Sequence, residues 1–167
     1  MENIYRGIAL LAILLSGCAT NEAPTNKPGN NVSIAKVNEV QKKIASCIAE
    51  VNLSEDAKYV DEHIFVLTEK SPNAKELFNS SDKIAFDQAA VLIRFKESTL
   101  KCRDITNELP SPALLAVYTN FYTNIDAVYK DLIDKRITIG VANQERQMRI
   151  QYAKSRFAQI LKSETGE

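Results

Sequence analysis

Residues 110–122 read PSPALLAVYTNFY, and this segment places a helix boundary directly before a long apolar helix face. Pro110 ends one helix, Ser111 is suited to cap the next, and Pro112 suits its first position. Apolar residues then recur at helical steps, namely Leu114, Leu115, Tyr118, Phe121, Tyr122, Ile125, Tyr129 and Leu132. This spacing predicts an amphipathic helix over residues 112–135. Its aromatic stripe is also compatible with a ligand groove, but core packing is the favoured interpretation.

Two helices are predicted at the start of the domain. Ser33 is suited to cap a helix over residues 33–52, and Ser54 is suited to cap the next one. The second helix is expected to end at Ser71-Pro72-Asn73. Residues 63–68 have a composition that also fits a strand. No second strand is evident to pair with them, so the helix is preferred.

A longer helix is predicted over residues 82–109, after a short helical turn at 74–78. Its apolar residues form two stripes on nearly opposite faces, Ile84, Val91, Phe95, Cys102, Ile105 and Leu109 on one and Phe86, Ile93 and Leu100 on the other. Two apolar faces predict packing on both sides and a central position. A last helix is predicted over 141–162, after a turn in which Gly140 is expected to supply backbone freedom. Together these segments predict an all-α, up-and-down bundle of four to five helices over residues 33–163.

The N-terminus has the pattern of a secretory signal. Residues 8–15 are an unbroken apolar run, preceded by a short polar start and followed by Ser16, Gly17 and Cys18. A transmembrane helix is the alternative, but it needs about 20 apolar residues to cross the bilayer. The short run and the small residues after it therefore favour a signal peptide.

The segment Leu15-Ser16-Gly17-Cys18 resembles the lipobox of bacterial lipoproteins. The resemblance implies that residues 1–17 are a cleaved signal peptide and that Cys18 carries acyl chains such as palmitate. Two or more chains give stable membrane anchoring. Ala19 and Thr20, rather than aspartate, follow Cys18, which by the same resemblance implies the outer membrane. Residues 18–32 are rich in proline and asparagine and are predicted to be a flexible tether that holds a periplasm-facing domain.

Cys47 and Cys102 remain once Cys18 is assigned to lipid. The implied compartment is oxidising, so the two are predicted to form a disulfide, with two separate buried thiols as the alternative. A metal site is not expected, because His63 is the only histidine and neither cysteine has another nearby in sequence.

The composition indicates a globular domain without an evident active site. Hydrophobic residues make up 45% and charged residues 25%, and the formal net charge is zero. This balance gives no basic bias toward nucleic acid. The sequence lacks the common nucleophile, zinc and phosphate-loop motifs, so neither an enzyme nor a cofactor is predicted. His63 is interpreted as a surface or rim residue, and Asp126, Asp131 and Asp134 as a solvated helix face.

Basic residues concentrate near the C-terminus. Residues 135–162 contain seven lysines and arginines against the single acid Glu145. Arg149 and Arg156 share a helix face and are candidates to bind anionic groups. Pairing with acidic residues of the helices 82–109 and 112–135 is the favoured alternative. Arg146 lies within the apolar stripe, where it needs a partner, and an aspartate of the helix 112–135 is expected.

Val141, Met148 and Tyr152 form a second apolar patch on the predicted helix 141–162. Cover by another helix is the favoured interpretation, and a docking surface is the alternative. The location and the absent catalytic motifs predict a protein that binds or scaffolds another envelope protein. The alternative is binding of peptidoglycan or anionic lipid head groups through the basic helix.

Overall fold

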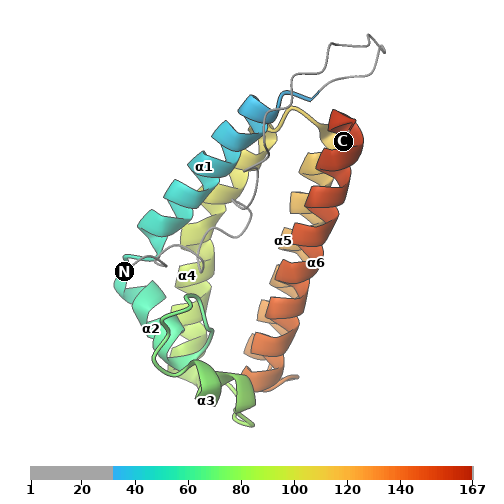
Figure 1. The fold of residues 1–167 in the computed structure, drawn as a ribbon. Helices are drawn as coiled ribbons and strands as arrows, with labels where there is room; N and C mark the ends of the chain where they lie inside the picture. The colour runs from blue at the N-terminus through green and yellow to red at the C-terminus, as the bar shows by residue number, and fades with distance from the viewer. Residues whose placement is uncertain (1–31, 167) are drawn as a thin grey trace, which may run out of the picture.

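The computed structural model describes residues 32–166, and this part of the chain contains helices and no strand. The α-helices are α1 (Ile34–Val51), α2 (Glu55–His63), α3 (Ala74–Asn79), α4 (Phe86–Asp104), α5 (Pro112–Ile133) and α6 (Ile139–Thr165). The long helices α1, α4, α5 and α6 alternate in direction along the molecule (Figure 1). The predicted all-α, up-and-down bundle is confirmed, and the short α3 raises the number of helices above the predicted five. The signal peptide, Cys18 and nearly all of the predicted tether lie outside the described residues.

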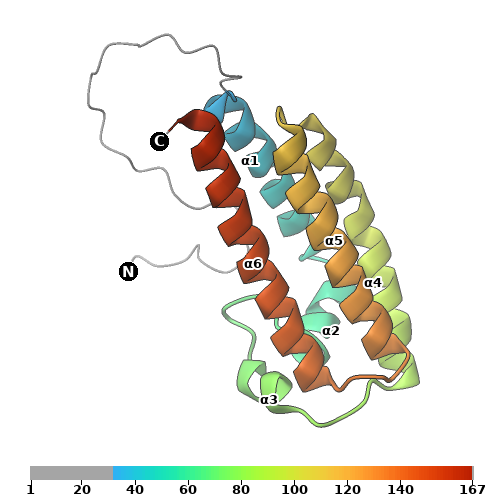
Figure 2. The same cartoon turned by 90° about the vertical axis from the view of Figure 1, so that its right-hand side faces the viewer.

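The long helices pack in two pairs. Helix α1 packs on α4, and α5 packs on α6, while the short helices extend the pairs because α2 packs on α4 and α3 on α6 (Figures 1 and 2). A one-turn 3-10 helix, Ile105–Glu108, continues α4 and contacts both α1 and α5. Large buried side chains fill the space between the pairs, including Phe65, Leu92, Phe95, Tyr118 and Tyr129.

Serine caps define the starts of three helices, as predicted. The side chains of Ser33, Ser54 and Ser111 accept hydrogen bonds from backbone N–H groups of the first turns of α1, α2 and α5, at 3.3, 3.2 and 3.2 Å. Pro112 begins α5, where its missing N–H has no helical partner to lose. These local signals need no tertiary contact, which explains why the sequence predicts them well.

The predicted helix after Ser54 is too long. Helix α2 ends at His63, and residues 64–67 are neither helix nor strand. The Asp61 carboxylate accepts the backbone N–H groups of Leu67 and Thr68 at 2.6 and 3.1 Å and so turns the chain back on the helix. Phe65 is fully buried and stacks on Tyr129, with ring centroids 5.0 Å apart. The apolar residues here are buried as an irregular segment inside the bundle, not as a helix face.

Asn143 of α6 holds this irregular segment in place. Its Oδ1 accepts from the Val66 N–H at 2.9 Å, and its Nδ2 donates to the carbonyls of Ile64 and Ile139 at 2.7 and 3.0 Å. The side chain is only 2% exposed. One carboxamide thus satisfies the backbone of residues 64–66 much as a neighbouring strand would.

The prediction for the helix 82–109 was wrong at its start and in its packing. Helix α4 begins at Phe86, where Gln88 accepts the Ala85 N–H at 2.9 Å, and residues 80–85 form a connection. The stripe of Phe86, Ile93 and Leu100 is exposed, at 89%, 42% and 46%. Helix α4 lies at an edge of the bundle rather than at its centre, because α1, α2 and the bundle interior cover only one of its faces.

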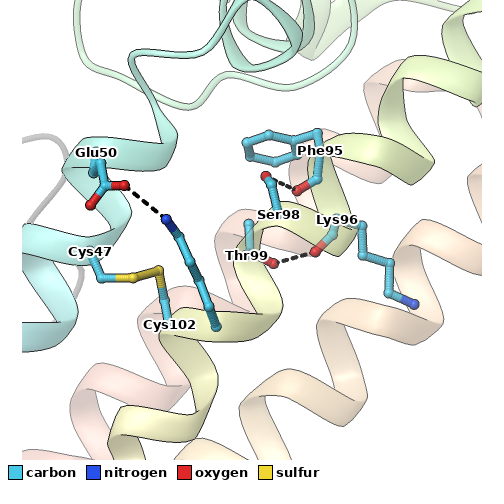
Figure 3. Close-up of a disulfide and its surroundings, with 8 residues drawn as sticks. Cys47, Glu50, Phe95, Lys96, Ser98, Thr99 and Cys102 are labelled. Carbon is cyan, nitrogen blue, oxygen red and sulfur yellow. Dashed lines mark hydrogen bonds and ion pairs between the residues drawn. A yellow bond between two sulfur atoms is a disulfide. The ribbon is translucent and has the colours of Figure 1, made fainter.

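A disulfide joins Cys47 of α1 to Cys102 of α4, which confirms the predicted pairing (Figure 3). The Cα atoms are 5.6 Å apart, and the bond spans 55 residues of sequence. Cys102 is buried, whereas Cys47 is only partly so. An ion pair between Glu50 and Lys101, at 2.9 Å, links the same two helices. The disulfide therefore closes a loop of the chain that contains α2 and α3.

Gly140 serves a different purpose from the one predicted. It lies inside α6 and has no left-handed backbone conformation. A Cβ atom at this position would lie 2.5 Å from the Ser80 carbonyl oxygen and 3.0 Å from that of Phe78. The Gly140 N–H also donates to Ser80 O at 3.0 Å. Glycine is required because the connection after α3 crosses α6 in direct backbone contact.

The substitution Gly140→Ala is expected to lower the free energy of unfolding by about 1–3 kcal/mol, because backbone atoms must move to admit the methyl group. Urea denaturation measures this change. Ala158→Gly, at an exposed position of the same helix, is the control. It should lower stability by about 1 kcal/mol, since helices ordinarily prefer alanine. A stabilising Gly140→Ala variant would contradict the close approach.

Candidate functional site

A groove of about 380 Å³ runs between α5 and α6 and brings together three of the four predicted binding residues. Arg149, Tyr152 and Arg156 line its α6 side. The α5 side and the floor are formed by small, amide and apolar residues, namely Ala113, Ala116, Val117, Asn120, Phe121, Asn124, Ala153 and Ile160. We call this feature the α5–α6 groove. Met148, the fourth predicted residue, is exposed on α6 but does not line it.

In the described residues, no carboxylate of a neighbouring helix forms an ion pair with Arg149 or Arg156 of the α5–α6 groove. Arg149 has a carboxylate contact with Glu145, one turn away on its own helix, at 3.8 Å. Arg156 donates to the amide oxygen of Gln159 at 3.3 Å and has no ion pair in the described chain. The favoured prediction of pairing with the preceding helices is thus wrong for both. It holds for Arg136, which follows α5 and pairs with Asp131 in the last turn of α5 and with Asp134 at its C-terminal cap.

The second apolar patch of α6 is exposed in the described structure. Val141 is 39% exposed, Met148 57% and Tyr152 62%. The expectation that another helix covers this patch is therefore wrong. Helices α3 and α5 pack on other faces of α6, which leaves these three residues on the outer side, beside the groove arginines.

Asp126 is not the solvated carboxylate that was predicted. Arg103 of α4 donates to both of its oxygens, at 2.8 and 2.9 Å, and Lys96 lies 3.4 Å away. Partial burial alone would raise the pKa of Asp126, but the hydrogen bonds and charges of Arg103 and Lys96 lower it below its ordinary value. This cluster joins the two helix pairs across the bundle.

Arg146 finds its partners outside α5, contrary to prediction. Its Nη1 donates to the Val66 carbonyl at 3.0 Å, and its guanidinium lies over the Phe65 ring, 5.7 Å from the centroid. None of the ion pairs in residues 32–166 includes it. Charge patterning could not reveal a carbonyl partner 80 residues away in sequence.

A crevice of about 120 Å³ lies between the two helix pairs, and the sequence analysis interpreted its aromatic residues on α5 as core. Tyr118 and Tyr122 line it, together with Arg103 and Arg146. Burial raises the pKa of Tyr122 to about 12, although the Arg103 charge acts in the opposite direction. Burial also raises the pKa of Tyr118. Both phenols therefore stay protonated at neutral pH. The aromatic stripe of α5 gave a signal for this feature, because the ligand-groove interpretation rested on the same residues.

His63 is exposed on α2, 3.8 Å from Glu62, as predicted for a surface residue. Residues 32–166 contain no cluster of three metal-ligating side chains. Within the same range, no helix has the length and apolar character needed to span a bilayer.

Comparisons with known proteins found no relative of this chain. No family model matches the chain, no curated protein matches its sequence, and no solved structure matches its fold.

Proposed function

We propose that this protein is a lipid-anchored cell-envelope protein that binds another envelope protein through the α5–α6 groove. The observation that carries the proposal is the placement of Arg149 and Arg156 along one groove, without a carboxylate from a neighbouring helix in the described chain. They are seven residues apart, which corresponds to about 10 Å along a helix. Such a pair suits two acidic side chains of one partner segment.

The surroundings of the α5–α6 groove support a protein partner. Tyr152 and Met148 expose large apolar surfaces next to the arginines. Tyrosine, methionine and arginine are enriched at protein interfaces, and tyrosine and arginine often carry much of the binding energy. Ala113 and Ala116 have small side chains on the α5 side of the groove, which allows a partner backbone to approach closely.

The proposed anchor completes this function. The lipobox-like segment ending at Cys18 would attach the protein to the outer membrane, with residues 18–32 as the tether of a periplasm-facing domain. We expect Cys18→Ser in the full chain to abolish incorporation of labelled palmitate and to move the protein out of the membrane fraction. Unchanged membrane association in that variant would contradict the anchor without bearing on the groove.

The groove is tested by photo-crosslinking in the cell envelope, with the photoreactive residue at Tyr152 of the full chain. We expect an adduct whose partner peptide is acidic and which falls at least about tenfold when Arg149→Glu and Arg156→Glu are combined, because like charges then meet. The control combines Lys42→Glu and Lys75→Glu, two exposed lysines away from the groove with the same change in charge. Equal loss in both variants, or no adduct at Tyr152, would refute the proposal.

Anionic lipid or peptidoglycan is the second candidate, favoured by the same two guanidinium groups, which also suit phosphates and carboxylates. In this case the Cys18→Ser chain, which lacks the proposed acyl anchor, should sediment with isolated sacculi or with phosphatidylglycerol vesicles. The same chain with Arg149→Glu and Arg156→Glu should not, and neutral phosphatidylcholine vesicles should bind neither of the two. Sedimentation that is unchanged by the charge reversal would exclude this candidate.

A further inference from the structure

The crevice between the two helix pairs has the composition of a small-molecule site. Its walls are mainly apolar and aromatic, including Ile44, Ile48, Phe95, Ile125 and Tyr129. Protein interiors are normally packed without voids much larger than a water molecule. The crevice, of about 120 Å³, leaves this packing incomplete between the helix pairs and is partly open to solvent. Ligand sites in helical bundles commonly lie between helices in such apolar surroundings, with a few polar groups.

The two arginines of the crevice differ in their electrostatic state. Arg103 is neutralised by Asp126 through two hydrogen bonds. Arg146 is partly buried. Within residues 32–166 it donates a hydrogen bond to the Val66 carbonyl and lies over the Phe65 ring, and neither group carries charge. A guanidinium has five N–H donors, so one hydrogen bond leaves most of its capacity unused. A cation shielded from water in this way gains most from an anionic partner.

We infer that the crevice binds a small organic anion, with an aromatic or short aliphatic body between the helix pairs and one carboxylate at Arg146. The size limits the ligand to a small body: an enclosed apolar cavity of about 150 Å³ holds benzene, and this crevice of about 120 Å³ is smaller but partly open to solvent. The charge sets the orientation, since Arg146 is the lining cation without a carboxylate partner in the described structure. This site is separate from the α5–α6 groove, and the two share only Phe121 among their lining residues.

The test is a titration of the full chain, followed by NMR shifts of methyl groups in the crevice, with three probes of similar size. Benzoate carries the carboxylate, benzyl alcohol is neutral, and benzylammonium is positive. We expect benzoate to bind at least about tenfold more tightly than benzyl alcohol, and benzylammonium not to bind. Shifts at Ile44, Ile48 and Ile125 should report the binding, because these residues line the crevice.

Two variants separate charge from shape. Arg146→Gln should reduce benzoate affinity to that of benzyl alcohol and leave benzyl alcohol binding unchanged. Ala45→Leu keeps Arg146 but extends a side chain from the crevice wall, so it should abolish binding of both probes. Ala45→Leu also tests the site if Arg146→Gln does not fold. The control Arg149→Gln changes an arginine of the groove and should have no effect.

Three results would overturn the inference. The first is equal affinity for benzoate and benzyl alcohol, and the second is benzoate binding that survives Ala45→Leu. The third is loss of benzoate binding in the Arg149→Gln control, which would place the anion in the α5–α6 groove. None of these results bears on the partner adduct at Tyr152, so this inference and the proposed function fail independently.

Discussion

Replacement of Asn143 by alanine is expected to lower the free energy of unfolding by about 3–5 kcal/mol, as measured by urea denaturation. The carboxamide makes three hydrogen bonds to the backbone, and the residue is 2% exposed. Its removal leaves the Val66 N–H and the Ile64 carbonyl without this partner in the bundle interior. Each buried polar group that loses its partner costs about 1–3 kcal/mol, so two of them cost about 2–6 kcal/mol, and the range above is the middle of this interval.

The control for this prediction is the variant Gln144→Ala, at the neighbouring residue of α6. Gln144 also donates to a backbone carbonyl, that of Phe78 at 3.0 Å, but its side chain is exposed. Water can replace that hydrogen bond, so Gln144→Ala should cost less than about 1 kcal/mol. A loss of similar size in the two variants would show that residues 64–66 do not depend on Asn143. Amide exchange at Val66 adds a local readout, because its N–H should lose protection in Asn143→Ala.

Loss of the disulfide is expected to have a comparable effect. Replacing Cys47 and Cys102 together by alanine should lower the free energy of unfolding by about 4 kcal/mol, because the bond restrains a loop of 55 residues in the unfolded chain. Urea denaturation of the oxidised wild type and the double variant measures the difference. The urea m-value of the variant should also rise, since its unfolded chain exposes more surface.

Reduced wild-type protein provides the matched comparison. With dithiothreitol present, its unfolding curve should approach that of the double alanine variant, whereas the variant itself should not respond to the reductant. A variant whose stability lies within 1 kcal/mol of the oxidised wild type would contradict the prediction. It would mean that packing of α1 on α4, rather than the covalent link, restricts this part of the chain.

The helix boundaries that the sequence predicts correctly depend on local chemistry. Ser33, Ser54 and Ser111 bond within their own first turns, and Pro112 suits a first turn in any surroundings. The predicted start at residue 82 was wrong because the first turn of α4 is capped by a residue of the helix itself, Gln88, whose side chain accepts the Ala85 N–H. The predicted continuation past His63 was wrong because an apolar run can be buried equally well as a helix face or as an extended segment.

The candidate site was predicted in part. Helical spacing placed Arg149 and Arg156 on one face, and the structure shows them together with Tyr152 on a groove. The α5 side of that groove includes Ala113, Ala116 and two asparagines, which have no distinctive pattern in the sequence. Their importance arises only because α5 lies beside α6. The crevice likewise needs residues of four helices, so no single stretch of sequence could indicate its presence.

By itself, the sequence established the all-α class, three serine-capped helix starts and the pairing of Cys47 with Cys102, and it placed Arg149, Tyr152 and Arg156 on one helix. Each of these follows from chemistry within a few turns of helix or, for the cysteines, from the oxidising compartment that the lipobox resemblance implies. Only the tertiary structure revealed the exposed face of α4, the contact that requires Gly140, the role of Asn143 and the uncompensated charge of Arg146. These four depend on how far apart the two helix pairs lie and on which side of each helix the other elements cover. Such distances are set by the packing of the whole bundle, which local periodicity does not encode.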